Sequence, residues 1–175
     1  MPTNNNTDLN EIITQMKTDW INNCCGVPET TPPTPCPQFH FGYPSDVDEL
    51  HKKNLPLMVC NVPTSTSVAD EYEANVVNNT TVFKIQIYQY NASRYQVTND
   101  LIKAGLWDTM EHCFYYWLNT VLNNLGSKVV LGNGVVQITR RTQSSNDQLL
   151  QIECTFNLNY YRYCMEINYP TPPTP

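Results

Sequence analysis

Residues 99–125, NDLIKAGLWDTMEHCFYYWLNTVLNNL, are the stretch that decides the fold of this chain. Thr98 or Asn99 can cap a helix here, because either side chain can accept a hydrogen bond from a free N–H of the first turn. Gly126 follows, and glycine readily takes the left-handed conformation that ends many helices. The apolar residues in between recur every three or four positions: Leu106, Met110, Cys113, Phe114, Trp117, Leu118, Val121, Leu122 and Leu125. This spacing predicts one long helix with a wide apolar face.

Strand patterns lie on both sides of this helix. Residues 82–90 and 149–161 alternate apolar with other residues, which is typical of strands that bury one face. Residues 129–131 and 135–141 flank the sequence Gly132-Asn133-Gly134, which suits positive φ. We therefore expect these two segments to form a tight hairpin.

The beginning of the chain predicts one more helix and two more strands. Residues 8–23 have apolar residues at helical spacing, with Asp8 as the cap and Glu11 placed to complete a capping box. Residues 39–43 are a candidate short strand, and residues 55–62 are a continuous apolar run of strand length.

Together these elements predict a single α+β domain over residues 1–175. We expect an antiparallel or mixed sheet, with one long helix and an N-terminal helix packed on one face, plus extended loops. Two proline-rich segments stand outside this core, an insert at residues 28–37 and a tail at residues 170–175, and both contain the pentapeptide TPPTP. Such segments favour the extended polyproline conformation and suit either a rigid spacer or a ligand for an aromatic groove.

Residues 63–81 form a third segment outside the core, which we call the acidic extended arm. Its acidic centre consists of Asp70, Glu71 and Glu73. The segment is longer than an ordinary connection, so it is either a long hairpin arm or a functional loop. A solvated loop is the simplest interpretation.

The charge balance excludes some classes of partner. Ten basic and sixteen acidic residues give a formal net charge of −6. Broad binding to nucleic acid or to anionic membranes needs clustered basic residues, and here only Lys52 with Lys53 and Arg140 with Arg141 are adjacent. No apolar run approaches the length of a membrane span, and residues 1–10 lack a targeting pattern, so we expect a protein made and kept in a cytosol.

No sequence motif indicates an enzyme. A G-x-S-x-G nucleophile elbow is absent, and the histidines, His40, His51 and His112, lie in weak contexts. His112 can face Asp108 across one helical turn, but a solvated pair is the simplest interpretation.

A metal site built from cysteine and histidine is the other chemical possibility. Four soft ligands are available in Cys24, Cys25, Cys36 and His40. The two leading cysteines are adjacent instead of separated by two residues, which does not match a zinc motif. Three further cysteines, Cys60, Cys113 and Cys154, lie among apolar neighbours and are expected to be reduced and buried. We expect no metal, no cofactor and no catalytic residue.

The order of elements resembles a known family. An N-terminal helix is followed by LPLMVCNVP (residues 55–63), the arm, VFKIQIYQY (residues 82–90), the long helix, and the pair ITRR and LLQIECTFNLNYYR (residues 138–141 and 149–162). This order and pattern, from Asp8 to Arg162, resemble the tail-completion or tail-terminator proteins of tailed bacteriophages.

The resemblance implies a structural, non-enzymatic virion protein, assembled in the host cytoplasm. Members of the family form rings at the head–tail connector, so it implies sixfold or twelvefold self-association, contacts with portal, neck or tail proteins, DNA only passing through a channel, and no membrane. The partner-contact residues implied in this way are Asp70, Glu71, Glu73, Arg140, Arg141, Pro172 and Pro173.

Two other classes of protein stay open on the sequence. One is a small cytosolic α+β protein that binds a metal or ligand, or acts as an enzyme, through its cysteine and histidine groups. The other is a peptide-type adaptor that offers TPPTP to a partner.

Overall fold

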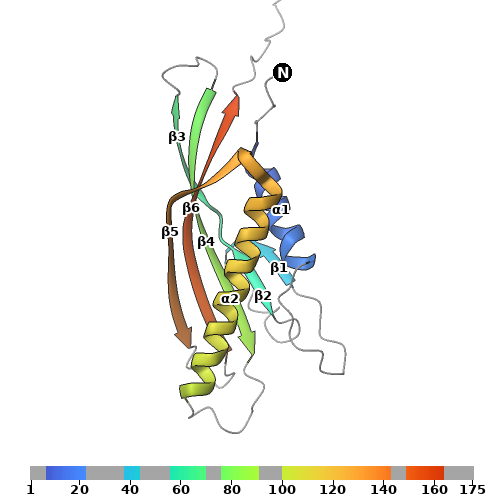
Figure 1. Ribbon diagram of the computed structural model, residues 1–175, viewed down its shortest axis with the longest axis vertical. Coiled ribbons are helices and arrows are strands. Elements are labelled where there is room, and N and C mark those ends of the chain that lie inside the picture. Colours follow the sequence, from blue (N-terminus) through green and yellow to red (C-terminus); the bar gives the residue numbers. More distant parts are fainter. Residues whose placement is uncertain are drawn as a thin grey trace, which may run out of the picture.

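A mixed six-stranded sheet carries two helices on one face, which confirms the predicted α+β fold (Figure 1). The computed structural model describes residues 7–22, 38–43, 56–69, 76–90, 100–142 and 149–163. Its elements are α1 (Leu9–Asn22), β1 (Gln38–Phe41), β2 (Leu57–Cys60), β3 (Thr64–Ala69), β4 (Val76–Tyr90), α2 (Asp100–Leu125), a short 3-10 helix (Gly126–Lys128), β5 (Val129–Thr142) and β6 (Leu149–Tyr163).

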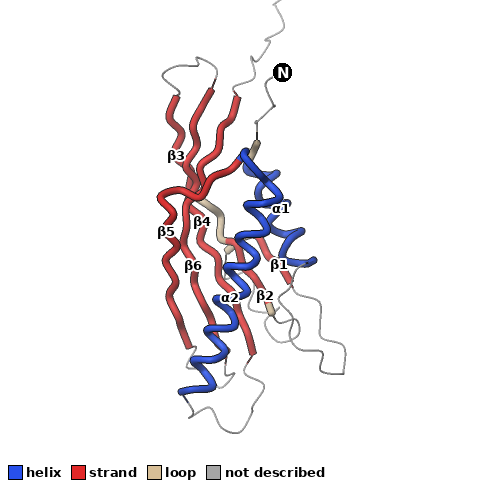
Figure 2. Tube along the Cα trace, viewed as in Figure 1, coloured by secondary structure: helices blue, strands red, loops and turns tan. Residues whose placement is uncertain are grey.

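The strands follow the order β1-β2-β4-β6-β5, and β3 also pairs with β4 (Figure 2). β1 runs parallel to β2, whereas every other pair is antiparallel. β2 pairs with residues 85–88 of β4 and β3 pairs with residues 77–82, so the two follow each other along one edge of β4. Residues 61–63 separate β2 from β3 along this edge, although the Asn61 N–H still donates to the Lys84 carbonyl (3.0 Å).

The long helix α2 lies where the sequence predicts it and packs its apolar face on the sheet. Phe114 and Trp117 are fully buried, and the Phe114 ring lies 5.9 Å from that of Phe156 in β6. Phe156 also stacks on Phe83 of β4, with ring centroids 5.7 Å apart. On the helix side the alternation predicted for β4 and β6 is confirmed, since these residues are buried there: Phe83, Ile85, Ile87, Leu150, Ile152, Cys154, Phe156 and Leu158. On the opposite face Gln86 and Gln151 are also buried, and Tyr88 packs with Leu57 and Val59 of β2 in a second, smaller core.

The N-terminal helix α1 packs beside α2 on the same face of the sheet (Figure 1). The Trp117 Nε1–H donates to the Met16 carbonyl (3.0 Å), which joins the two helices inside the core. The predicted cap is confirmed, because the Glu11 N–H donates to Asp8 Oδ1 (2.7 Å).

The Glu11 carboxylate is engaged away from the cap of α1. It accepts hydrogen bonds from Lys128 Nζ (2.7 Å) and from the Thr7 hydroxyl. These bonds, that of Lys128 first, lower the pKa of Glu11. The side chain therefore ties α1 to the short 3-10 helix that follows α2.

The hairpin predicted at Gly132-Asn133-Gly134 is wrong. Residues 129–132 and 136–142 both pair with β6 in the same direction, so β5 is one strand with an irregularity between Gly132 and Val136. Positive φ values do occur there, 54° at Asn133 and 60° at Gly134, but they accommodate extra residues as a β-bulge and the chain does not reverse. A Cβ on Gly132 would lie 3.0 Å from Asn157 Cβ, so the close approach to β6 also favours glycine.

The acidic extended arm is largely strand, so the solvated-loop interpretation of residues 63–81 is wrong and the hairpin-arm alternative is right. β3 covers Thr64–Ala69, and β4 begins at Val76, six residues before its predicted start. Both faces of this part of the sheet carry polar residues. The sequence therefore lacks the alternation of apolar and polar residues from which the other strands are predicted. Asp70, Glu71 and Glu73 lie outside the described residues.

The Phe156→Ala substitution tests the core contact between α2 and the sheet. We expect it to lower the free energy of unfolding by about 3–5 kcal/mol, because it removes the ring between Phe83 and Phe114. Denaturant unfolding of the variant beside wild type measures the change. Val130→Ala, at an exposed position of β5, is the control and is expected to stay within about 0.5 kcal/mol; equal effects of the two variants would contradict the packing described.

Candidate functional site

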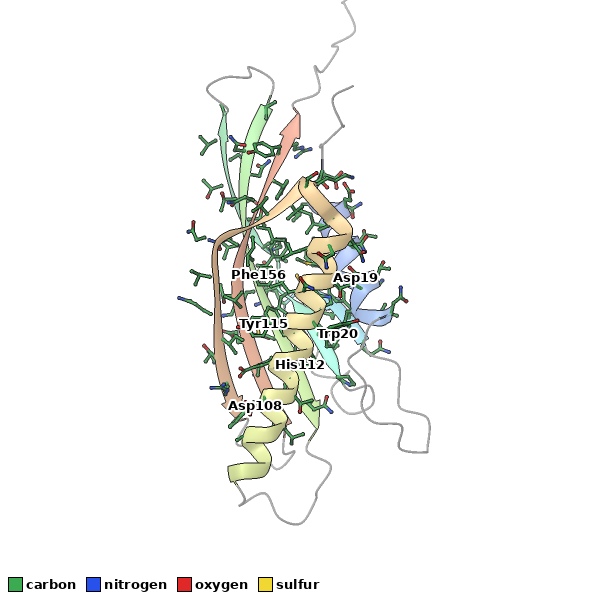
Figure 3. The ribbon with its side chains drawn as sticks, in the orientation of Figure 1. Asp19, Trp20, Asp108, His112, Tyr115 and Phe156 are labelled. Atoms are coloured by element: carbon green, nitrogen blue, oxygen red, sulfur yellow. The ribbon has the colours of Figure 1, made fainter. Side chains whose placement is uncertain are left out.

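The described residues do not bring a set of metal ligands together. They contain no cluster of three or more His, Cys, Asp or Glu side chains able to hold a metal ion. His112 and Asp108 are both exposed along the outer side of α2 (Figure 3). His40 lies in β1, while its proposed co-ligands Cys24, Cys25 and Cys36, and also His51, lie outside the described residues.

The cysteine thiols of the core are poor nucleophiles. Cys60 and Cys154 are fully buried. Burial raises the pKa of Cys60 to about 12. Burial also raises the pKa of Cys154, and the nearby carboxylates of Glu111 and Glu153 raise it further. Because the thiolate is the reactive form, these two residues are expected to be inert in the folded protein.

A shallow hollow of about 560 Å³ opens between α1 and β1. The hollow is lined by Ile13, Thr14, Lys17, Thr18, Ile21, Asn22, Phe39 and Phe41. Its lining has one charged side chain and no pair of groups that could transfer a proton or hold a metal, so it does not have the composition of an active site.

Arg140 and Arg141 are separated by the pleat of β5. Arg140 Nε lies 2.6 Å from Glu111 Oε1 of α2, on the helix side of the sheet. Arg141 Nη2 lies 3.6 Å from Glu153 Oε1, on the opposite face. Neighbouring strand residues point to opposite faces, so the two arginines do not form one basic patch. Both stay about half exposed.

Glu153 is the centre of a polar network on the face away from the helices. Besides Arg141, its carboxylate meets Lys84 Nζ (3.1 Å) and accepts a hydrogen bond from Gln86 Nε2 (3.2 Å). Gln86 in turn accepts from the Tyr88 hydroxyl (2.7 Å). This network sets two cations, Lys84 and Arg141, against one carboxylate, and both cations stay about half exposed.

The sheet continues beyond the helices (Figure 1). We call this part the distal sheet; it consists of β3, residues 76–82 of β4 and residues 157–163 of β6, with residues 129–132 of β5 paired at its base. The acidic run Asp70, Glu71 and Glu73 falls, in sequence, between β3 and β4. Pro172 and Pro173 fall after β6, outside the described residues.

Hydroxyl and amide groups hold the helix-side face of the distal sheet together. Ser65 Oγ and Thr81 Oγ1 are 2.7 Å apart, and Thr81 Oγ1 donates to the Tyr160 hydroxyl (3.2 Å). Ser67 Oγ donates to Asn79 Oδ1 (2.5 Å). Thr81 is buried and Tyr160 belongs to the main core, so cross-strand hydrogen bonds add to apolar packing at the base of the distal sheet.

The opposite face of the distal sheet is exposed and uncharged. Its register sets Val68, Asn78 and Tyr161 in one row and Thr66, Thr80, Asn159 and Val130 in the next. Val68 is 62% exposed and Val130 is 58% exposed. At the end of β6, Tyr160 points into the protein and Tyr161 points out.

β3 is the edge strand of the distal sheet. All six of its side chains are exposed, and β4 is its one partner among the described strands. Its sequence TSTSVA contains no charged residue, proline or glycine. Sequence reasoning missed this strand, although its threonines and valine are residues that favour strands.

The chain matches no protein-family model and no curated protein sequence. Neither helix in the described part of the chain combines the length and the apolarity needed to cross a membrane.

Thiol labelling tests the inert character of the core cysteines. In the folded protein at pH 8 we expect Cys60 and Cys154 to resist iodoacetamide, because burial keeps them protonated and out of reach. Peptide mass spectrometry after labelling, with and without denaturant, measures this for each residue. Rapid modification of either thiol in the native protein would contradict the assignment and revive a nucleophilic role.

Proposed function

We propose that the protein is a structural, non-enzymatic subunit that assembles with copies of itself. The observation that carries this proposal is the distal sheet, which extends past the helices and exposes an uncharged face and a bare strand edge. Unprotected strand edges promote pairing with another chain, and exposed apolar side chains gathered on one face are typical of contact surfaces.

The class of assembly we propose is a ring at the head–tail connector, neck or tail of a tailed bacteriophage. The resemblance in element order supports this, and sixfold or twelvefold symmetry is the form it suggests. The net charge of −6 suits the lining of a channel through which DNA passes without binding, since like charges repel. In this proposal portal, neck or tail proteins are the further partners, and the virion is the final location.

A ligand-binding role is the second candidate. The observation that favours it is the hollow between α1 and β1, where Phe39 and Phe41 face Ile13 and Ile21. Such a lining suits an apolar ligand, with Lys17 available for a negative group. A small apolar acid that stabilises the protein against heat, with the stabilisation lost in Ile21→Asp, would support this role.

The mass of the purified protein in solution tests the main proposal. We expect a multiple of the 20.1 kDa chain that corresponds to a closed ring, because the distal sheet is exposed in a single copy. Multi-angle light scattering gives the mass, and negative-stain images show whether the particle is annular.

Other solution masses can contradict the proposal. A monomer at all concentrations, which also fails to join purified portal or tail proteins, would remove the assembly role. A monomer that joins such proteins would keep the role and place ring formation on the partner.

A further inference from the structure

β3 offers an edge that no other described strand covers. Its six residues span roughly 20 Å, and its pairing with β4 uses the hydrogen-bonding groups of one edge alone. The groups of the other edge meet no strand in the described part of the chain. An edge of this length is a template for one further extended segment.

The other edges of the sheet are protected in the ways that natural proteins use. β5 carries the bulge between Gly132 and Val136, and Arg140 and Arg141 follow it on the same strand. β1 is only four residues long. β3 contains no bulge and no charged residue. Among the described edge strands, β3 is therefore the one that lacks such protection.

We propose that the β3 edge binds the β3 edge of a second copy of this chain, in antiparallel orientation, and joins the two sheets into one. This inference rests on the proposed self-assembly and adds its partner strand and orientation. A two-fold contact of this kind is isologous, because the same surface serves on both subunits.

Charge selects both the partner and the orientation. The chain continues from Ala69 into Asp70 and Glu71, so parallel pairing would set acidic residues side by side. Antiparallel pairing separates the acidic ends of the two strands. It also brings each acidic end toward the start of the partner strand, where Lys84 lies on the neighbouring β4.

The faces of the sheet restrict the register. A two-fold axis normal to the sheet leaves the outward faces of both copies on the same side of the joined sheet. Two residues at opposed positions must therefore point to the same face of that sheet. Thr66 and Val68 lie on the outward face, whereas Ser65 and Ser67 lie on the helix side. The axis therefore passes through Thr66 or through Ser67, and that residue opposes its own copy.

The β3 contact differs from the contacts that close a ring. A ring joins two different surfaces head to tail, whereas the β3 contact joins identical surfaces. If both exist, two rings meet through their distal sheets, and loss of the β3 contact separates them into single rings.

Two matched lysine variants test the inference. Val68→Lys places a charge on the edge strand, and Val135→Lys places the same charge at a similarly exposed position in the bulge of β5. We expect Val68→Lys to halve the solution mass, because lysine blocks strand pairing, and Val135→Lys to keep it. Circular dichroism and thermal unfolding check that both variants are folded.

Cross-linking provides a second measurement on the folded assembly. In the antiparallel pair, opposed residues lie within disulfide range, so either Thr66→Cys or Ser67→Cys is expected to form a covalent dimer under mild oxidation. Wild type gives the background from native cysteines, and Val135→Cys is the position control.

The results separate this inference from the proposed function. An annular particle whose mass is unchanged in Val68→Lys, with no dimer from either cysteine variant, overturns the β3 contact and leaves the ring. A wild-type dimer that becomes a monomer in Val68→Lys supports the β3 contact and removes the ring. A wild-type monomer overturns the β3 contact, and it removes the proposed function as well if it also fails to join purified portal or tail proteins.

Discussion

Phe156 lies between Phe83 of its neighbouring strand and Phe114 of α2, and the arrangement of the protein depends on this contact. It sets the long helix across the centre of the sheet. Trp117, one helical turn further on, then reaches the Met16 carbonyl and holds α1 against the same face. One helix face therefore orders both the sheet and the second helix, because the buried aromatic rings cannot shift without leaving a cavity.

The helices cover only part of the strands, and this divides the sheet into two regions. Under the helices the inner residues are aromatic and aliphatic, and burial stabilises them. In the distal sheet, hydroxyl hydrogen bonds join the inner residues Ser65, Thr81 and Tyr160, and the main core reaches only its base, at Leu158 and Tyr160. Such a region is held more weakly and exposes both an edge and a face. It is therefore suited to gain stability from a second chain, which supports an assembly role more than a catalytic one.

Some of this organisation could be predicted from the sequence, because it depends on local periodicity. The helical spacing of α2 and the alternation of β4 and β6 each bury one face, and burial leaves a repeat that can be read directly. The Asp8 cap could be predicted for the same reason, since it involves residues three apart. The sequence also argued against a catalytic or metal role, because His112 lies in a weak context and the cysteine spacing matches no zinc motif.

The sequence by itself determined the α+β class, the two helices and the main buried strands, since each depends on neighbours along the chain. Only the tertiary structure decided three features. Gly132-Asn133-Gly134 forms a bulge and not a hairpin, because the segments on both sides pair with the same strand β6. Arg140 and Arg141 bind carboxylates on opposite faces, because Glu111 and Glu153 arrive from different elements. β3 is an edge strand, because its polar residues are ordered by pairing with β4 and not by burial, and pairing between distant residues leaves no periodic signal in the sequence.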